Sequence, residues 1–202
     1  SQKSPERVFK VVFLGSSGVG KTSFIHRFCT GKPRGKTTAT VGMDFQMKTL
    51  SVGSSTITLQ LWDTAGQERS FCSITEQYYR KADGILAMYD LTRSASFSAL
   101  GGWMRSVKEK ACDGVPLVLL ANKLDRAEGR QVAASAGRGL AKQHRALFYE
   151  CSAETGCNIE EVMTQLASYV LLGVGGSSAG SAERESNFSM TREVKNNSCL
   201  LG

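Results

Sequence analysis

The sequence lacks the marks of a membrane-spanning or secreted protein. No apolar run approaches the ~20 residues that cross a bilayer, and the first residues do not resemble a secretory leader. Its six cysteines include no CxxC pair and no metal-ligand spacing. We therefore expect free thiols and a cytoplasmic protein.

A clustered basic patch with interleaved aromatic residues, typical of nucleic-acid binding, is also missing. The formal net charge is +7, but the basic residues are spread over residues 27–48 and 105–145 with few aromatics between them. Such a distribution indicates a solvated surface and a preference for phosphate. We expect no nucleic acid among the partners.

The length and composition suit one domain followed by a tail. The chain has 202 residues, of which 41% are hydrophobic. From Gly173 onward Gly, Ser, Ala and Asn dominate, a composition that buries too little apolar surface to order itself. We expect a domain over residues 7–172 and a disordered tail over residues 173–202. The start at Ser1 leaves open whether further domains precede it.

Apolar strand patterns alternate with helical ones, which predicts an α/β fold with a mostly parallel sheet covered on both faces. Asn158, with Glu161 three residues later, is a typical N-cap for the last helix. The predicted strands are residues 8–14, 44–52, 56–62, 84–89, 115–121 and 147–151, with a hairpin around Gly53. The predicted helices are residues 21–29, 94–111, 130–145 and 159–172.

The first strand is followed by Gly15-x4-Gly20-Lys21-Thr22, which fits the phosphate-binding pattern GxxxxGK[ST]. Glycines let the backbone amides wrap a phosphate, and the helix N-terminus adds partial positive charge. Lys21 contributes a full charge near the β and γ phosphates, and Thr22 offers a hydroxyl to Mg²⁺. The residues expected to bind phosphate are Ser16, Ser17, Gly18, Val19, Gly20, Lys21, Thr22 and Ser23.

A later strand leads into Asn122-Lys123-Leu124-Asp125, at the strand end where open α/β sheets bind ligands. The carboxylate of Asp125 can accept hydrogen bonds from guanine N1–H and from its amino group. Adenine offers neither donor, so Asp125 would be buried and unpaired against it. Asn122 would tie the segments together, and the stem of Lys123 would lie along the base. These residues favour guanine and disfavour a P-loop ATPase or kinase.

The next strand ends before Ser152, Ala153 and Glu154, which we also expect to touch the base. A backbone amide in this segment could donate to the guanine oxygen that adenine lacks.

Five residues fit the chemistry of a third phosphate and its metal ion: Thr22, Thr40, Asp63, Gly66 and Gln67. The hydroxyls of Thr22 and Thr40 suit a Mg²⁺ site, and Asp63, at a strand end, suits holding a water of that metal. Gly66 can donate its amide to a γ-phosphate, and Gln67 can orient an attacking water. Ordering of these loops by the γ-phosphate, and their release after hydrolysis, would make a two-state switch.

Together these motifs resemble the Rab family of Ras-like small GTPases, over about residues 7–172. The resemblance implies a Ras-like P-loop NTPase fold with a six-stranded sheet and five helices. It also implies a GDP/GTP cycle that serves vesicle trafficking and is run by exchange factors and activating proteins. The motifs that carry it are residues 15–22, 40–45, 62–69, 78–84, 122–125 and 152–153.

The resemblance also implies where partners bind. Rab-like effectors typically contact an aromatic triad, which here corresponds to Phe45, Trp62 and Tyr78. Each of these is as readily explained as a core or half-buried aromatic. The expected partner segments run from Thr37 to Phe45 and from Gln67 to Tyr79, together with Trp62.

The chain departs from the Rab pattern near the nucleotide. The aromatic that covers guanine in the first switch is replaced by Pro33, and the lysine of the usual Ser-Ala-Lys motif is replaced by Glu154. The second switch is one residue longer than usual. Ser17 stands where Ras proteins have glycine, but Rab-like chains often carry a small residue there, so hydrolysis need not be lost.

The C-terminus carries a single cysteine, Cys199, four residues from the end, with Gly202 last. This is close to a prenylation box, although Rab-like tails commonly end in paired cysteines. We expect one prenyl group on Cys199 and residence at the cytosolic face of intracellular membranes. The tail has no net charge, so anchoring by one lipid chain would be weak.

Two functions remain open at the level of sequence. The first is a switch that hydrolyses GTP, slowly without an activating protein because no arginine is identifiable as a finger in cis. The second is an interaction module that guanine nucleotide stabilises and that hardly turns over. Thr40, Gly66 and Gln67 favour the switch, whereas Pro33 and the longer second switch keep the module possible.

Overall fold

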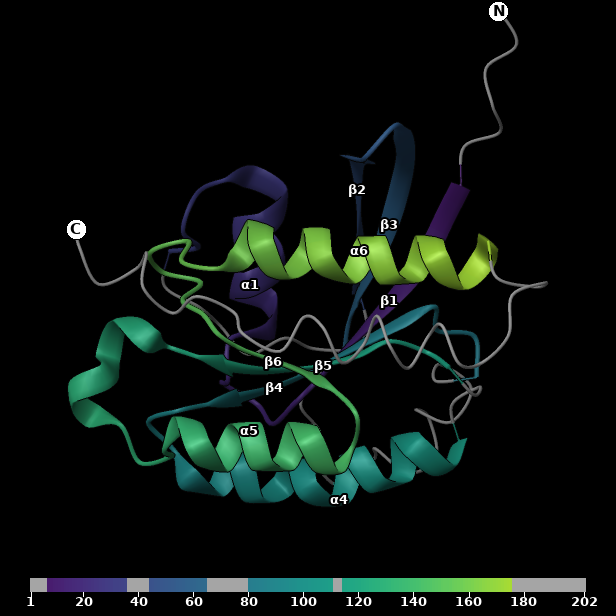
Figure 1. Ribbon diagram of the computed structural model, residues 1–202. Coiled ribbons are helices and arrows are strands. Elements are labelled where there is room, and N and C mark those ends of the chain that lie inside the picture. The colour runs from purple at the N-terminus through teal and green to yellow at the C-terminus, as the bar shows by residue number, and fades with distance from the viewer. Residues whose placement is uncertain (1–6, 36–43, 65–79, 111–113, 176–202) are drawn as a thin grey trace, which may run out of the picture.

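The computed structural model describes residues 7–35, 44–64, 80–110 and 114–175. Within these ranges the chain forms six strands, four α-helices and one 3-10 helix (Figure 1). The strands are β1 (Arg7–Leu14), β2 (Asp44–Val52), β3 (Ser55–Asp63), β4 (Gly84–Asp90), β5 (Leu117–Asn122) and β6 (Leu147–Glu150). The helices are α1 (Lys21–Thr30), α4 (Ser94–Lys110), η1 (Leu124–Gly129), α5 (Ala134–Gln143) and α6 (Ile159–Gly175).

The strands form one sheet in the order β2-β3-β1-β4-β5-β6. Only the β2–β3 pair is antiparallel, and the other neighbours are parallel. The predicted α/β fold, with a mostly parallel sheet and one hairpin edge, is therefore confirmed. The carboxyl ends of β1, β3, β4, β5 and β6 lie at one edge of this sheet, which is where such sheets bind ligands.

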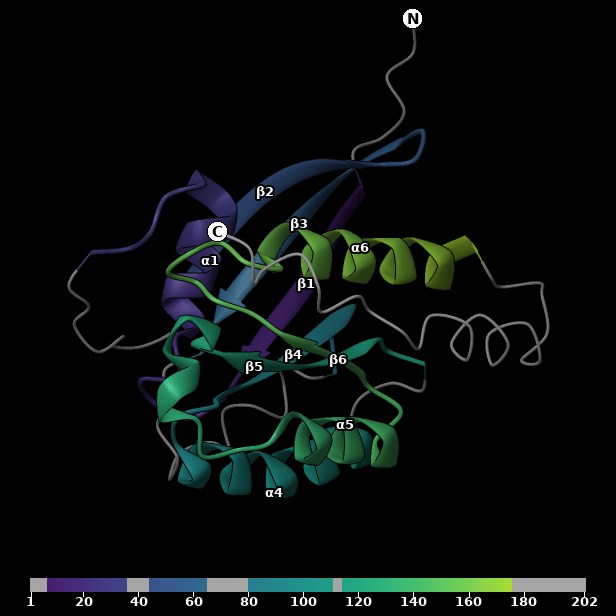
Figure 2. The ribbon, with the colours of Figure 1, turned by 60° about the vertical axis from the view of Figure 1, so that its left-hand side comes forward.

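Helices cover both faces of the sheet. Helices α1 and α6 lie on one face, and α4 and α5 lie on the other, as both views show (Figures 1 and 2). Both β4 and most of β5 are fully buried between these layers. Their continuous apolar sequences suit this position, because a strand covered on both faces has no solvent side.

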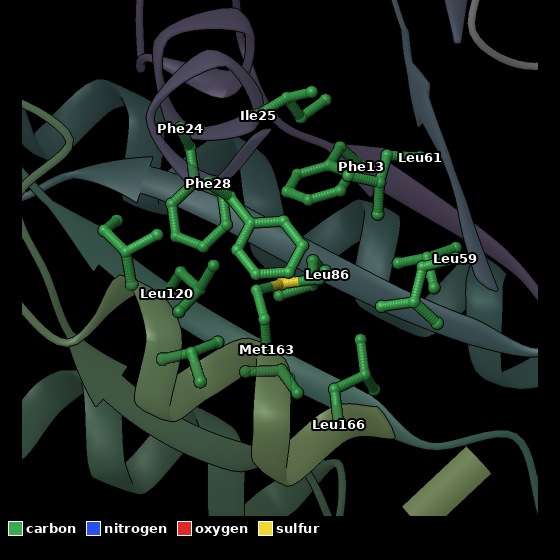
Figure 3. Packing of buried hydrophobic residues seen from close by; sticks show 14 of the residues in the cluster. Phe13, Phe24, Ile25, Phe28, Leu59, Leu61, Leu86, Leu120, Met163 and Leu166 are labelled. Carbon is green, nitrogen blue, oxygen red and sulfur yellow. The ribbon is translucent and has the colours of Figure 1, made fainter. Parts of the chain in front are cut away.

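The larger core lies between the sheet and the α1–α6 layer. Phe24 and Phe28 of α1 meet leucines of β3, β4 and β5, and Met163 and Leu166 of α6 close the far side (Figure 3). Phe13 and Phe24 pack with their ring centroids 5.5 Å apart. Each such buried side chain contributes about 1.5–3 kcal/mol of transfer free energy. This core fixes α1, and with it the loop that precedes α1.

A second core lies under α4 and α5, around Tyr89 and Phe97, whose rings pack edge to face at 4.9 Å. Gly137 of α5 lies directly against this cluster. A β-carbon at that position would be 2.4 Å from a ring carbon of Phe148 and 2.6 Å from the Tyr89 hydroxyl. Gly139, two residues along the same helix, has no neighbouring atom within 4 Å of such a β-carbon.

Three elements differ from the sequence-based prediction by two residues or more. The helix expected over residues 130–145 begins only at Ala134 and ends at Gln143, and residues 124–129 before it form η1, which was not predicted. The cause is tertiary: the amides of Gln131 and Val132 both donate to the carbonyl of Leu91 (2.8 and 3.1 Å), and Arg130 pairs with a neighbouring strand. Helix α6 continues to Gly175, three residues beyond its predicted end, and β5 starts two residues later than predicted.

The start of α6 lies where the sequence places it. The carbonyl of Asn158 accepts the first helical hydrogen bond, from the amide of Val162 (3.1 Å), and its side-chain amide donates to the carbonyl of Glu150 (2.7 Å). Asn158 has a positive φ of 60°, which asparagine tolerates better than most residues. Over the residues that the structure describes, no helix has both the length and the apolar character needed to cross a bilayer.

Candidate functional site

Four short segments meet at the carboxyl edge of the sheet. They lie at the carboxyl ends of β1, β3, β5 and β6 and correspond to residues 15–20, 63–64, 122–125 and 151–155. Three of the four are joined by hydrogen bonds that run through Asn122. The fourth contacts the start of helix α1, which continues the first, through Asp63 and Thr22. The geometry therefore brings together sequence motifs that lie more than a hundred residues apart.

The loop after β1 leads directly into helix α1. Gly20 is the last residue before the helix and has φ 103°, a left-handed conformation that favours glycine. The helix N-terminus and its unpaired amides therefore face this loop, an arrangement that suits an anion. Of the expected phosphate ligands here, Ser17 is exposed, whereas Ser16 is buried and its hydroxyl has no partner among the described residues.

Lys21 turns back over this loop. Its ammonium donates to the carbonyls of Gly15 (2.5 Å) and Ser16 (3.1 Å), and the residue is only 6% exposed. Burial lowers the pKa of Lys21 to about 8, although the nearby Asp63 carboxylate opposes this shift. A buried cation whose hydrogen bonds to the described residues go to carbonyl oxygens can exchange them for a phosphate.

Asn122 joins the phosphate loop to the segment after β6. Its side-chain amide donates to the carbonyl of Val19 (2.9 Å), and its side-chain oxygen accepts from the amide of Ala153 (3.1 Å). The thiol of the buried Cys151 lies 3.7 Å from the same oxygen. Asn122 is 2% exposed, so these contacts are formed away from solvent. The sequence assigned Asn122 this tying role.

Asp125 is held by a hydroxyl from the segment after β6. Ser152 Oγ donates to Asp125 Oδ1 (2.6 Å) and itself accepts from the amide of Thr155 (3.1 Å). Arg126 lies 3.8 Å from the other carboxylate oxygen. The carboxylate of Asp125 is thus fixed in orientation, which a bidentate contact with a base requires.

Lys123 is held at both its backbone and its side chain. Its backbone has φ 70°, which is unusual for a residue other than glycine. Its ammonium forms an ion pair with Asp90 at 2.8 Å. Its stem is thereby kept in one direction along the edge of the sheet.

Thr22 and Asp63 bring two oxygen ligands together beside the phosphate loop. The hydroxyl of Thr22 donates to Asp63 Oδ2, and Asp63 is 5% exposed. The next residue, Thr64, donates its hydroxyl to the carbonyl of Phe13 (2.6 Å) and so fixes the end of β3 against β1. A hydroxyl and a carboxylate are hard oxygen donors of the kind that Mg²⁺ prefers.

Sequence reasoning missed three residues that support this site: Asp90, Arg93 and Arg27. Asp90 carried a usable signal, because it is an acid at a strand end, directly opposite Asn122 in the β4–β5 register. Arg27, on α1, donates to the carbonyl of Glu154 (2.6 Å), and a β-carbon on Gly156 would be 3.0 Å from its Nε. The partners of Arg27 and Arg93 are too distant in sequence for any local pattern to indicate them.

Several expected residues lie outside the described part of the chain: Thr40, Gly66, Gln67, Tyr78 and Cys199. Pro33 and Glu154, the two departures from the Rab pattern near the expected nucleotide, lie in the described part of the chain. Pro33 is exposed, and the side chain of Glu154 is exposed beside the base segment.

An exposed apolar patch lies on β2 and β3, next to the end of β3 that carries Asp63. Phe45 is 46% exposed and stacks on Trp62 with ring centroids 4.9 Å apart, while Met47 is 50% exposed. The ammonium of Lys10 lies over the Trp62 ring, 4.6 Å from its centroid. Tyr78, the third expected aromatic, is outside the described residues.

Comparison with known proteins agrees with this arrangement. The sequence model of the Ras family matches residues 10–172. The chain is 41% identical to Ras-related protein Rab-13 of Rattus norvegicus, over 99% of both sequences. It is 49% identical over 84% of its length to EF-hand calcium-binding domain-containing protein 4B of Homo sapiens, and 48% identical over 82% to Ras-related protein Rab-44 of Homo sapiens.

The last two relatives are much longer proteins. The chain spans 23% of the EF-hand protein and 16% of Rab-44. The phosphate loop, the Asn122 network and the match over residues 10–172 lead to one assignment. The chain belongs to the Ras family and is a Rab-like small GTPase.

Proposed function

We propose that this chain is a GDP/GTP switch that hydrolyses GTP with Mg²⁺ and acts in intracellular membrane trafficking. The observation that carries the proposal is the joint formed by Asn122. Its side chain links the loop expected to hold phosphate, at Val19, to the segment expected to hold the base, at Ala153. One ligand with a base at one end and phosphates at the other would satisfy both.

At the phosphate end, the N-terminus of α1 and the ammonium of Lys21 would bind the β and γ phosphates. Lys21 would leave the carbonyls of Gly15 and Ser16 for phosphate oxygens, which restore a full negative partner to a buried cation. The hydroxyl of Thr22 would bind Mg²⁺ and Asp63 would hold a water of the metal, which neutralises phosphate charge when bound. Thr40 is proposed as its further ligand.

At the base end, Asp125 would accept from guanine N1–H and the amino group. The Ser152 hydroxyl holds the carboxylate in place, so its orientation is set before the base arrives. The stem of Lys123 would lie along the base, and a backbone amide of residues 152–154 would donate to the guanine oxygen. Specificity follows because adenine offers no donor to the carboxylate oxygens of Asp125 that guanine would engage.

Hydrolysis is assigned to residues of the second switch. Gln67 would orient the attacking water, and the amide of Gly66 would bind the γ-phosphate. Turnover by the chain alone would be slow, and an activating protein would raise it about 10³–10⁵-fold by supplying an arginine.

Partners would bind where the switch segments meet the exposed aromatics. The stacked Phe45 and Trp62, with Met47 beside them, offer an apolar patch suited to effectors. Exchange factors and activating proteins would contact the segments that contain Thr40 and Gln67. A prenyl group on Cys199 would attach the chain to the cytosolic face of membranes, weakly because it is one lipid.

Calorimetric titration of the full chain with GDP and with ADP, each with Mg²⁺, tests the proposal. We expect tight binding of GDP and none of ADP at the same concentrations. Equal affinity for the two nucleotides, or no binding of GDP, would overturn it.

The alternative is an interaction module that binds nucleotide but hardly hydrolyses it. Measuring phosphate release from GTP in a single turnover distinguishes this module from a switch. A switch loses its hydrolysis when Gln67 is replaced by Leu, whereas a module shows the same negligible rate in both proteins. The features that support this alternative are the exposed Pro33 and the second switch, which is one residue longer than usual.

A further inference from the structure

A short turn between β4 and α4 lies between the loop after β1, proposed to bind phosphate, and the segment after β5, proposed to bind the base. This turn, residues 90–93, follows β4, which pairs with β1 on one side and β5 on the other. Asp90 is opposite Asn122 in the β4–β5 register, and the amide of Leu91 donates to the Asn122 carbonyl (3.1 Å). The phosphate loop after β1 and the base segment after β5 are therefore both within reach of the 90–93 turn.

The first residue of the turn reaches toward the base segment. Asp90 Oδ2 lies 2.8 Å from the ammonium of Lys123, and its Oδ1 accepts from the amide (2.9 Å) and the hydroxyl (2.6 Å) of Thr92. Burial alone would raise the pKa of Asp90, but the hydrogen bonds from Lys123 and Thr92 outweigh it and hold the pKa below its usual range. A charged and nearly buried carboxylate thus fixes the Lys123 side chain.

The last residue of the turn reaches in the opposite direction, toward the phosphate loop. Arg93 Nη2 donates to the carbonyl of Ser17 (2.7 Å). A β-carbon built on Gly18 would lie 3.8 Å from Arg93 Nη1 and within 4 Å of no other atom of the described residues. The guanidinium of Arg93 therefore lies against the peptide between Ser17 and Gly18, a bond whose orientation determines where the Gly18 amide points.

The Asp90 and Arg93 side chains both project from a turn whose backbone is held by hydrogen bonds. Ser96, in the first turn of α4, is 1% exposed, and its hydroxyl bonds the amide of Asp90 (3.0 Å) and the carbonyl of Arg93 (2.7 Å). The amide of Arg93 also donates to the carbonyl of Asp90 (2.9 Å). With its backbone closed in this way, the turn holds both side chains at a fixed separation.

We propose that the 90–93 turn is a clasp that sets how long nucleotide is retained, with Asp90 positioning Lys123 and Arg93 positioning the peptide between Ser17 and Gly18. Neither residue needs to touch the ligand, so both are positioning residues. The inference rests on the proposed binding of guanine nucleotide. It adds that two contacts slow nucleotide release and can be weakened separately. The contact of Asp90 with Lys123 is called the base arm, and the contact of Arg93 with Ser17 is called the phosphate arm.

The test compares affinities and dissociation rates for GMP, GDP and GTP in the full chain. Asp90→Asn leaves one oxygen to serve both Lys123 and Thr92, so one donor loses its acceptor. We expect about tenfold faster GDP release, the scale of a hydrogen bond to a charged group. All three nucleotides should be weakened by the same factor, because all three carry guanine.

The phosphate arm gives a different pattern. Arg93→Gln removes the charge from a solvent-exposed contact, so we expect about threefold weaker binding of GDP and GTP with GMP unchanged. Arg93→Lys should recover part of the loss because it keeps a cationic donor. In the double variant Asp90→Asn/Arg93→Gln the two effects should multiply for GDP, since the arms act on different segments.

Matched controls separate the clasp from a general loss of stability. Glu160→Gln also neutralises a carboxylate that pairs with a lysine, Lys48 at 3.8 Å, but it lies on α6 away from the site. Arg105→Ala removes an exposed arginine from α4. Both controls should leave dissociation rates unchanged. Thermal unfolding of each nucleotide-free variant shows whether a faster rate merely follows a lower melting temperature.

The outcomes are distinct. If Asp90→Asn fails to fold, Thr92→Val, which removes one donor to Asp90, tests the same arm and should give a smaller effect in the same direction. Release rates within twofold of wild type for both arms, or equal effects of Arg93→Gln on GMP and GTP, would overturn the clasp and leave the proposed function intact. A wild-type chain that binds no guanine nucleotide would overturn both.

Discussion

The side-chain amide of Asn122 packs directly over the α-carbon of Gly20. A β-carbon added to Gly20 would lie 2.3 Å from Asn122 Nδ2, well inside any normal contact. That same amide nitrogen donates to the carbonyl of Val19. Glycine is therefore required at position 20 by the side chain of Asn122, whether or not the loop also has to wrap a phosphate.

Replacing Gly20 with Ala should abolish nucleotide binding. The new methyl group would push Asn122 out of its contacts with Val19 and Ala153, and φ 103° would add strain. Gly53→Ala is the matched control, because Gly53 also has a positive φ of 59° but nothing within 4 Å of a β-carbon. Calorimetry should show no GDP binding for Gly20→Ala and wild-type affinity for Gly53→Ala; retained binding in the first would contradict the packing described.

Nucleotide binding should take up a proton near pH 8. Burial lowers the pKa of Lys21 to about 8, so about half of the nucleotide-free molecules carry a neutral Lys21 at that pH. Phosphate favours the charged form, so each GDP bound should draw in roughly half a proton, and affinity should fall as pH rises above 8. Titrations at pH 8 in two buffers of different ionisation enthalpy measure this uptake.

The control for that measurement is the same pair of titrations at pH 7. Lys21 is then almost fully protonated before GDP arrives, so uptake by Lys21 should fall to about a tenth of a proton. Proton release at pH 8, or an uptake that does not depend on pH, would show that Lys21 is already charged in the free protein.

Pro33→Phe should slow GDP release. Proline at this exposed position offers no aromatic face to the base, and stacking of a base on an aromatic side chain contributes about 1–3 kcal/mol. We expect a decrease of about tenfold or more in the dissociation rate of a fluorescent GDP analogue. Lys32→Phe adds an aromatic at the neighbouring exposed residue and should not change the rate. An unaltered rate in Pro33→Phe would mean that residue 33 does not face the base.

Two glycines of α5 should respond in opposite directions to alanine. Gly137→Ala places a methyl group into Phe148 and the Tyr89 hydroxyl, so we expect a loss of about 1–3 kcal/mol in the free energy of unfolding. Gly139→Ala meets open space, and the higher helix propensity of alanine should add up to about 1 kcal/mol. Urea denaturation of both variants checks the pair. Equal shifts in both would contradict the close packing of Gly137.

Cys199→Ser should abolish labelling of the chain by a prenyl analogue in cells. The single cysteine four residues from the end is the proposed acceptor, and no second acceptor is expected nearby. Cys112→Ser, which changes a cysteine far from the C-terminus, should leave labelling intact. Equal labelling of wild type and Cys199→Ser would end the proposal of a prenyl anchor at this residue.

Much of the fold and the centre of the site could be predicted because their signals are local. A β-branched apolar run followed by Gly15-x4-Gly20-Lys21-Thr22 contains its own strand, turn and helix start. Asn122 and Asp125 were found in the same way, as polar residues that interrupt an apolar strand at its end. Chain order then fixed the mostly parallel sheet, since strands that alternate with helices allow few other arrangements.

The features that were missed depend on contacts between distant residues. Arg93 and its partner Ser17 are 76 residues apart, and Arg27 and Glu154 are 127 apart, with no periodicity to connect them. The start of α5 was placed too early for the same reason. Arg130 there forms a bidentate ion pair with Glu150 (2.6 and 3.1 Å), which keeps the chain extended although its sequence is compatible with helix.

Arg27 connects helix α1 to the segment after β6, so that one rigid helix contacts both parts of the proposed site. The helix starts at the loop proposed to bind the phosphates, and less than two turns later Arg27 holds the Glu154 carbonyl in the segment proposed to bind the base. An exchange partner that lifts this loop must therefore either break that contact or pull α1 along with it. In the second case, the grip on both ends of the nucleotide would loosen in a single movement.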